Sequence, residues 1–262
     1  MLIAKLTADP NLFRYCTGVT RPVFDTMLEM ALPFMTAPRR GHPWSEAHPP
    51  FLRLLLSLIY LRSNHSMLWL EIVTEVNDSS ISRFLKEARH VWKLIGFEPP
   101  EPDPDWKIPP IVCVDSFIVP IPRPGGWDAQ KPFFSKKHHQ HALKVQIVTV
   151  NRNVACLSPP EVASVSDSSL LERNPIPAAF NKGNVYGDKA YPRDKIVRPR
   201  KKGEAGYIRH VSSWISKIRV DVEHEIKDLK DFKALRGYRL RDPLESLGGV
   251  LCLVANAVRL AA

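Results

Sequence analysis

The chain has 262 residues, of which 44% are hydrophobic, enough for one large core or for one core with a small appendage. Its formal net charge of +10 favours a polyanionic partner, most commonly nucleic acid, although ribosomal and heparin-binding proteins are similarly basic. The four cysteines lie far apart, without a Cys-x-x-Cys pair, which is typical of thiols in a reducing compartment. No apolar run reaches the roughly 20 residues that a membrane span needs, so the sequence predicts a cytoplasmic protein without membrane association.

The signals at the start of the chain are helical. Two of the predicted helices are joined by the short polar turn Asn77-Asp78-Ser79, and the second carries Arg83 and Lys86 away from its apolar stripe. This arrangement resembles a helix-turn-helix with residues 78–92 as a DNA-contacting recognition helix. A plain bundle of three or four helices with a solvated polar face explains the same pattern. Apolar spacing predicts helices over residues 23–35, 50–61, 67–76 and 80–95.

A segment of alternating prolines follows these helices, from Glu98 to Asp105. Proline cannot continue a helix, and it biases the residue before it to extended conformations. We therefore expect a linker over residues 98–109. It would separate a small all-α domain, residues 1–97, from a second domain, residues 110–262, that ends in a C-terminal helix.

After the linker, runs of Val and Ile replace the helical period. They predict an α/β domain in which a mixed sheet with flanking helices resembles ribonuclease H. The predicted strands are 111–121, 142–150, 154–157 and 184–186, and the predicted helices are 166–172 and 214–233.

Three carboxylates in this domain are candidates for chemistry. Asp115 interrupts an apolar strand, which suits a metal site in a sheet or an edge-strand aspartate with a backbone or arginine partner. Asp188 ends a short strand after a glycine, which suits a metal site and equally an ordinary turn. Glu223 adjoins the apolar stripe of the long helix, with Arg219 and Lys230 along its side. That pattern suits three side chains that converge on one anionic ligand, or a solvent-exposed helix face that carries salt bridges.

Taken together, the three carboxylates favour metal-dependent phosphodiester cleavage, which needs several carboxylates converging from distant segments. One divalent ion would activate the attacking water or 3′-hydroxyl, and a second would stabilise the leaving oxygen. Mg²⁺ is the expected ion, with Mn²⁺ as the alternative, because hard oxygen ligands and phosphate substrates favour it.

The motifs around the three carboxylates occur in an order that resembles the DDE transposases of bacterial insertion sequences, in the insertion-sequence-five group and its Harbinger-like relatives. The similarity extends from about residue 111 to residue 232. The matching residues are Asp115-Ser116, Arg123-Pro124, Phe134-Ser135, Lys136-Lys137, His141-Ala-Leu-Lys144, Gly187-Asp188-Lys-Ala-Tyr191, and Arg219, Glu223 and Lys230 in the spacing Arg-x3-Glu-x6-Lys.

This resemblance implies a ribonuclease-H-like catalytic domain preceded by a helix-turn-helix. It implies that Asp115, Asp188 and Glu223 are both catalytic and metal-binding. Asp167 remains a rival for the second carboxylate, because it occupies the place of a frequent His-Asp pair. The resemblance further implies contacts with DNA, which for the segment before the second motif fall on Lys137, His141 and Lys144.

The activity that the resemblance implies is cut-and-paste strand cleavage and strand transfer at terminal inverted repeats. The partners would be double-stranded DNA, as repeat ends and as target, and further copies of the chain in a synaptic complex in the bacterial nucleoid. Two alternatives stay open: a catalytically inactive, transposase-derived DNA-binding protein, and a ribonuclease-H-like metal-dependent nuclease that never rejoins DNA.

Two further features bear on DNA binding. Residues 195–209 are densely cationic and include Arg200, Lys201 and Lys202, for which we expect contacts with the DNA backbone. Trp127 and Trp214 are candidates for stacking on an unpaired base, but core packing is the expected role of both.

Overall fold

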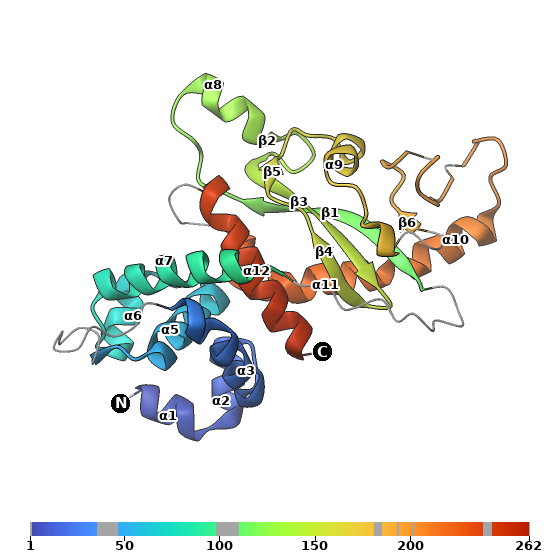
Figure 1. The fold of residues 1–262 in the computed structure, drawn as a ribbon. Coiled ribbons are helices and arrows are strands. Elements are labelled where there is room, and N and C mark those ends of the chain that lie inside the picture. Colours follow the sequence, from blue (N-terminus) through green and yellow to red (C-terminus); the bar gives the residue numbers. More distant parts are fainter. Residues whose placement is uncertain are drawn as a thin grey trace. The chain divides into compact units, whose positions relative to one another are not determined.

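The structure is a computed structural model that describes residues 2–35, 47–97, 110–180, 185–192, 194–200, 202–237 and 243–261. The chain divides into two compact units (Figure 1). The helical unit comprises Met1–Phe97 and Leu229–Ala262, and the sheet unit comprises Glu98–Asp228. The expected linker, residues 98–109, lies outside the described residues. Residues from Leu229 onward group with the N-terminal helices, which differs from the division expected from the sequence.

The helical unit is built from amphipathic helices whose buried faces follow the helical period. In the longest N-terminal helix the buried residues recur every three or four positions, as in Ile81, Phe84, Leu85 and Ala88. The predicted helix 23–35 ends at residue 31 and continues as a short 3-10 turn. The bounds are α1 (Leu2–Ala8), α2 (Pro10–Thr17), α3 (Arg21–Ala31), η1 (Leu32–Phe34), α5 (Pro50–Ser63), α6 (Met67–Thr74), α7 (Asp78–Ile95), η4 (Lys233–Arg236) and α12 (Pro243–Ala261).

Helix α5 lies in the centre of this unit, and it includes a buried charge. Arg53 is almost fully buried, and its Nη1 donates to both carboxylate oxygens of Glu87 on α7, at 2.6 and 2.8 Å. A buried guanidinium needs such a partner because desolvation of an unpaired charge is costly. The pair therefore specifies how α5 and α7 pack.

Helices α7 and α12 lie side by side (Figure 1), and a glycine allows their close approach. A Cβ atom added at Gly249 would lie 2.0 Å from the carbonyl oxygen of Arg89. The preceding residue, Gly248, has open space in the same position. Asn256 on α12 also donates to the carbonyl of Gly96, just after α7, at 3.0 Å.

The sheet unit contains a mixed sheet. Strand β3 is central: β1 pairs with it antiparallel along one edge, and β2, β5 and β4 follow one another along the other. Strand β6 pairs with β1 in parallel. The bounds are β1 (Val112–Pro120), β2 (Phe134–Ser135), β3 (Gln140–Val150), β4 (Asn153–Leu157), β5 (Glu161–Val162), β6 (Val185–Gly187), α8 (Trp127–Gln130), η2 (Lys131–Phe133), α9 (Asp167–Arg173), η3 (Ala178–Phe180), α10 (Arg209–Ile218) and α11 (Val220–Lys230), the last of which continues past the end of the unit.

Strand β1 presents its two faces to different helices because successive side chains of a strand alternate. Val112 and Val114 belong to a buried cluster that includes Leu171 of α9. On the opposite face, the thiol of Cys113 lies 3.7 Å from the carbonyl oxygen of Ile218 at the end of α10. Asp115 therefore shares a face with the junction of α10 and α11, and Ser116 shares a face with α9.

The predicted single helix over residues 214–233 is wrong, because the structure has two helices that meet at Arg219. The first begins earlier, at Arg209, and the second ends at Lys230. Arg219 keeps near-helical angles (φ −67°, ψ −16°), and the Glu223 N–H still donates to its carbonyl at 3.3 Å. The helical direction is thus kept across the interruption. In the described part of the chain, no helix is both long and apolar enough to cross a membrane.

The close approach of α7 and α12 gives a first testable prediction. We expect Gly249→Ala to lower the free energy of unfolding by about 1–3 kcal/mol, because the added methyl group would overlap backbone atoms of α7. Gly248→Ala is the matched control, and it should raise the stability by about 0.5–1 kcal/mol through helix propensity alone. Urea unfolding measures both values. Equal stabilities of the two variants would contradict this packing.

Candidate active site

Two aspartates lie at adjacent positions of the sheet unit. Asp115 lies in the middle of β1 and is largely buried, and the backbone N–H of Ser116 donates to its Oδ1 at 2.7 Å. Asp188 follows the last residue of β6. Since β1 and β6 are parallel and Val114 pairs with Gly187, the two aspartates are the next residues along neighbouring strands.

Gly187 is required for this arrangement. A Cβ atom there would lie 2.7 Å from the Ile196 side chain, 3.1 Å from that of Val114 and 3.2 Å from that of Tyr191. Any larger residue would push β6 away from β1 or displace the segment that carries Ile196. The glycine of the second motif therefore keeps Asp188 close to Asp115.

The guanidinium of Arg219 bridges the two aspartates. Its Nη2 donates to Oδ2 of Asp115 at 2.9 Å, and its Nη1 lies 3.7 Å from Oδ1 of Asp188. The Arg219 side chain is only 13% exposed, and its Nε is buried without a hydrogen-bond partner among the described residues. Low exposure strengthens such pairs relative to surface ion pairs. One cationic group thus holds two carboxylates of distant sequence segments at the same place.

The electrostatics at Asp115 are a balance of opposing effects. Burial raises the pKa of its carboxyl above the ordinary value, and the negative charge of Asp188 adds to the rise. The hydrogen bond from the Ser116 backbone and the charge of Arg219 oppose it. An ionised Asp115 in this environment favours a nearby positive charge.

Glu223, the third predicted carboxylate, lies on α11 one helical turn after Arg219, and it is exposed. Among the described residues there is no group of three His, Cys, Asp or Glu side chains that could hold a metal ion together. The structure therefore brings Asp115 and Asp188 to one arginine, with Glu223 on the same helical segment but not in a preformed set.

Lys230, predicted on the same side of the helix as Glu223, is the last residue of α11. Its ammonium group is partly buried, and burial, together with the charge of Arg236, lowers its pKa. Its backbone carbonyl accepts a hydrogen bond from Arg236 Nε at 2.7 Å.

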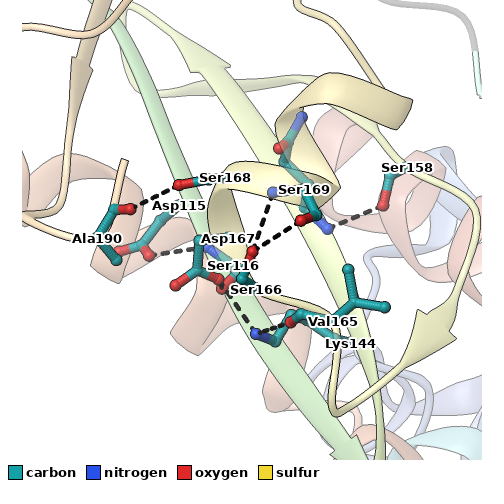
Figure 2. Close-up of polar contacts among 11 residues, drawn as sticks. Asp115, Ser116, Lys144, Ser158, Val165, Ser166, Asp167, Ser168, Ser169 and Ala190 are labelled. Carbon is teal, nitrogen blue, oxygen red and sulfur yellow. Dashed lines mark hydrogen bonds and ion pairs between the residues drawn. The ribbon is translucent and has the colours of Figure 1, made fainter. Parts of the chain in front are cut away.

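Asp167, the rival for the second carboxylate, lies in a different network, drawn in Figure 2. Its Oδ1 accepts a hydrogen bond from Ser116 Oγ at 2.5 Å and lies 3.3 Å from Nζ of Lys144. Lys144 also donates to the carbonyl of Val165 at 2.7 Å. Ser116 points to the opposite face of β1 from Asp115, so Asp167 does not share the Arg219 bridge. Sequence reasoning named all three side chains but missed the network that joins them. It expected a DNA contact for Lys144, whose Nζ instead lies between Asp167 and the carbonyl of Val165.

The other predicted DNA-binding residues take varied positions. Lys137 is exposed in the turn between β2 and β3, and the His141 ring on β3 contacts the Phe134 ring with centroids 5.4 Å apart. Lys202 is exposed, whereas Nη1 of Arg200 donates to the carbonyl of Ala205. Lys201 lies outside the described residues, and Arg83 and Lys86 are exposed on α7.

The expected core packing of Trp127 and Trp214 is wrong. Their exposed fractions are 70% and 54%. Trp214 makes one ring contact, with its centroid 5.7 Å from that of Tyr186 in an edge-to-face geometry. Trp127 lies on the short helix α8, which buries no residue, and Trp214 lies on α10, which buries Ile215. The size of a tryptophan side chain therefore did not specify its burial.

Tyr191, the tyrosine of the second motif, is buried beside the carboxylates. Its ring belongs to the cluster under β1, and its hydroxyl is buried without a hydrogen-bond partner among the described residues. Burial, followed by the charges of Asp167, Asp115 and Asp188, raises the pKa of this phenol far above its ordinary value. The hydroxyl therefore stays protonated and faces an acidic surrounding.

Comparison with known families agrees with this geometry. A family model described as "DDE superfamily endonuclease" matches residues 114–256, which is more than half of the chain. The match begins at the β1 segment that carries Asp115 and covers Asp188, Arg219 and Glu223. The chain therefore belongs to the DDE endonuclease superfamily. Comparisons with curated proteins and with solved structures gave no match.

This membership confirms the resemblance at the level of the superfamily and accounts for the mixed α/β unit with flanking helices. The coarser expectation of a nuclease or transposase that acts on DNA follows from it. Endonucleases of this superfamily generally use divalent metal ions.

The unpaired hydroxyl of Tyr191 gives the second prediction. We expect Tyr191→Phe to raise the free energy of unfolding by about 1 kcal/mol, because it removes a buried polar group that has no partner. Tyr15→Phe, at a tyrosine on α2 that is 78% exposed, should leave the stability unchanged. Chemical denaturation compares the two. A loss of stability in Tyr191→Phe would mean that the hydroxyl does have a partner.

Proposed function

We propose that the chain is a DNA transposase that cleaves and rejoins strands at the terminal inverted repeats of an insertion sequence of the insertion-sequence-five or Harbinger-like type. The observation that carries the proposal is the shared arginine. Asp115 and Asp188, on neighbouring parallel strands, meet the guanidinium of Arg219, one helical turn before Glu223. Three motif residues of distant segments therefore meet at one place, and the fourth follows on the same helical segment.

The donor set suits a divalent metal. Both aspartates offer hard carboxylate oxygens, which Mg²⁺ and Mn²⁺ prefer, and both are paired with a positive charge. Asp115 and Asp188 are the proposed ligands, and Glu223 is the proposed third. When bound, the metal would supply an activated oxygen nucleophile and would neutralise charge on the phosphate.

The residues of the chain have separate tasks in this proposal. Arg219 holds the two carboxylates together through one oxygen of each, and in this proposal it leaves that position when the metal ion binds. Its guanidinium then becomes available for the DNA phosphate, which it matches in geometry. The pair of Asp167 and Lys144 fixes Ser116, and with it the strand position of Asp115.

DNA recognition is proposed for helices α6 and α7, as a helix-turn-helix. Glu75 ends α6 in a left-handed conformation (φ 61°), and the Asn77 side chain caps α7 by accepting from the Ser79 N–H at 3.0 Å. Glu71 accepts from the Asn77 side chain and from the Asp78 N–H, which fixes the turn. A tight turn followed by a long helix with an exposed basic face supports insertion into a major groove.

A transposase-derived DNA-binding protein without cleavage activity is the second candidate. The absence of a group of three metal-ligating side chains among the described residues favours it. A metal-dependent nuclease that never rejoins DNA differs from both in its products. Cleavage separates the first candidate from the second, and strand transfer separates a transposase from a nuclease.

The carboxylates give the third prediction. On a plasmid that carries the gene with its flanking DNA, the wild type should cleave in Mg²⁺ or Mn²⁺ and should be inactive in EDTA. Asp115→Asn, Asp188→Asn and Glu223→Gln should each reduce the cleavage rate at least about a hundredfold, because each would lose a metal ligand. Gel analysis of the plasmid ends measures the rate.

Controls for this experiment lie on the same unit. Asp128→Asn and Glu172→Gln change exposed carboxylates on α8 and α9 and should cleave like the wild type. Full activity of Glu223→Gln would remove that residue from the site. Duplex binding by the wild type without any cleavage in either metal would favour the second candidate.

The fourth prediction concerns the proposed recognition helix. Arg83→Gln and Lys86→Gln should each weaken binding to duplex DNA and should lower the salt dependence of binding by about one unit of slope. The matched controls, Arg14→Gln on α2 and Lys5→Gln on α1, remove the same exposed charges elsewhere in the helical unit. Fluorescence anisotropy at several salt concentrations measures both quantities. Equal losses in all four variants would assign the effect to net charge alone.

A further inference from the structure

The sheet unit contains a groove that the proposed catalytic residues do not use. It lies between α10 and the segment that follows Ile196, and its volume is about 370 Å³. Its apolar side chains come from both sides, and two arginines belong to the same lining. The lining residues are Ile196, Val197, Arg198, Arg200, Gly206, Ile208, Val211, Ser212 and Ile215.

The apolar part of the groove is accessible. Ile208 is 50% exposed and Val211 is 48% exposed, although large aliphatic side chains of a folded chain are mostly buried. Trp214 lies one helical turn after Val211 on α10, and its ring is also exposed. Apolar side chains beside an exposed aromatic ring suit a flat, weakly polar ligand such as a nucleobase.

The charge at the groove is positive. The Nε of Arg198 is buried and has no hydrogen-bond partner among the described residues, and Arg200 donates through its Nη1 to the carbonyl of Ala205. The first turn of α10 also lines the groove, and its N-cap, Ile208, makes no side-chain capping hydrogen bond. Two guanidinium groups beside an apolar surface suit an anion attached to a flat ring.

We infer that this groove binds an unpaired nucleotide of a DNA strand. The base lies against Val211 and Ile208 beside the Trp214 ring, and the phosphate pairs with Arg198 and Arg200. Since the groove belongs to the segment between Asp188 and Glu223, the site would hold a strand that has left the duplex near the point of cleavage. This inference rests on the proposed action on DNA. It adds that this surface selects unpaired over paired nucleotides.

The test compares two single-stranded probes with equal backbone charge: a ten-nucleotide thymidine oligomer and an abasic oligomer of the same length. The wild type should bind the thymidine oligomer at least about fivefold more tightly, because each stacked base adds affinity. Val211→Asn should bring this ratio close to one. Arg198→Gln should weaken both probes by the same factor, because it removes a phosphate contact only. Anisotropy of labelled probes measures the affinities.

Matched variants and a duplex probe complete the design. Ile111→Asn, at an exposed aliphatic residue before β1, should keep the wild-type ratio, and Arg14→Gln, at an exposed arginine on α2, should keep the wild-type affinity for both probes. An unchanged ratio in Val211→Asn, or equal binding of both probes by the wild type, would overturn the groove assignment while duplex binding stays intact. If the wild type did not bind duplex DNA, that result would instead overturn the proposed function.

Discussion

The arrangement of the sheet unit depends on one ionic contact, the guanidinium of Arg219 between the carboxylates of Asp115 and Asp188. Two carboxylates at neighbouring, partly buried strand positions repel each other, and burial alone raises the pKa of Asp115. A third, positive group removes the repulsion and repays part of the desolvation cost. The close approach of β6 to β1 at Gly187 makes the contact possible. Arg219 itself lies at the junction of α10 and α11.

The same contact relates stability to function. A pair of carboxylates that a guanidinium neutralises is also suited to a divalent cation. Their negative charge can therefore be neutralised either by Arg219 or by a bound metal ion. Arg219 and Glu223 lie one turn apart, so a small shift of this segment would withdraw a cation from the carboxylates and offer them a third carboxylate. Under the proposed function, a conformational step of this kind would link binding of DNA phosphate by Arg219 to completion of the metal site.

Much of the fold was predictable because long periodic segments carry strong signals. Strands β1, β3 and β4 follow from their Val and Ile runs, and α5, α6 and α7 from apolar spacing, with ends that differ by a few residues. Strands β2 and β5 have two residues each, too few to show a period. The grouping of α12 with α7 depends on a contact between distant residues, Gly249 and Arg89, which no local pattern encodes.

The sequence named the residues of the candidate site, but it did not predict how their side chains contact one another. The motifs gave Asp115, Asp188 and Arg219, but the bridge between them depends on the pairing of β6 with β1, which the sequence does not state. The alternation of β1 separates Asp167 from Asp115, a distinction that sequence order alone could not make. We expected Trp214 in the core, yet its side chain is exposed, one helical turn after the groove residue Val211.

The most direct test of the central claim is a crystal structure of the chain soaked with Mn²⁺, with anomalous scattering used to locate the ion. The account predicts an anomalous peak coordinated by the carboxylates of Asp115 and Asp188, with Arg219 displaced from its position between them. Mn²⁺ bound elsewhere, or Arg219 still bridging both aspartates at saturating Mn²⁺, would contradict it.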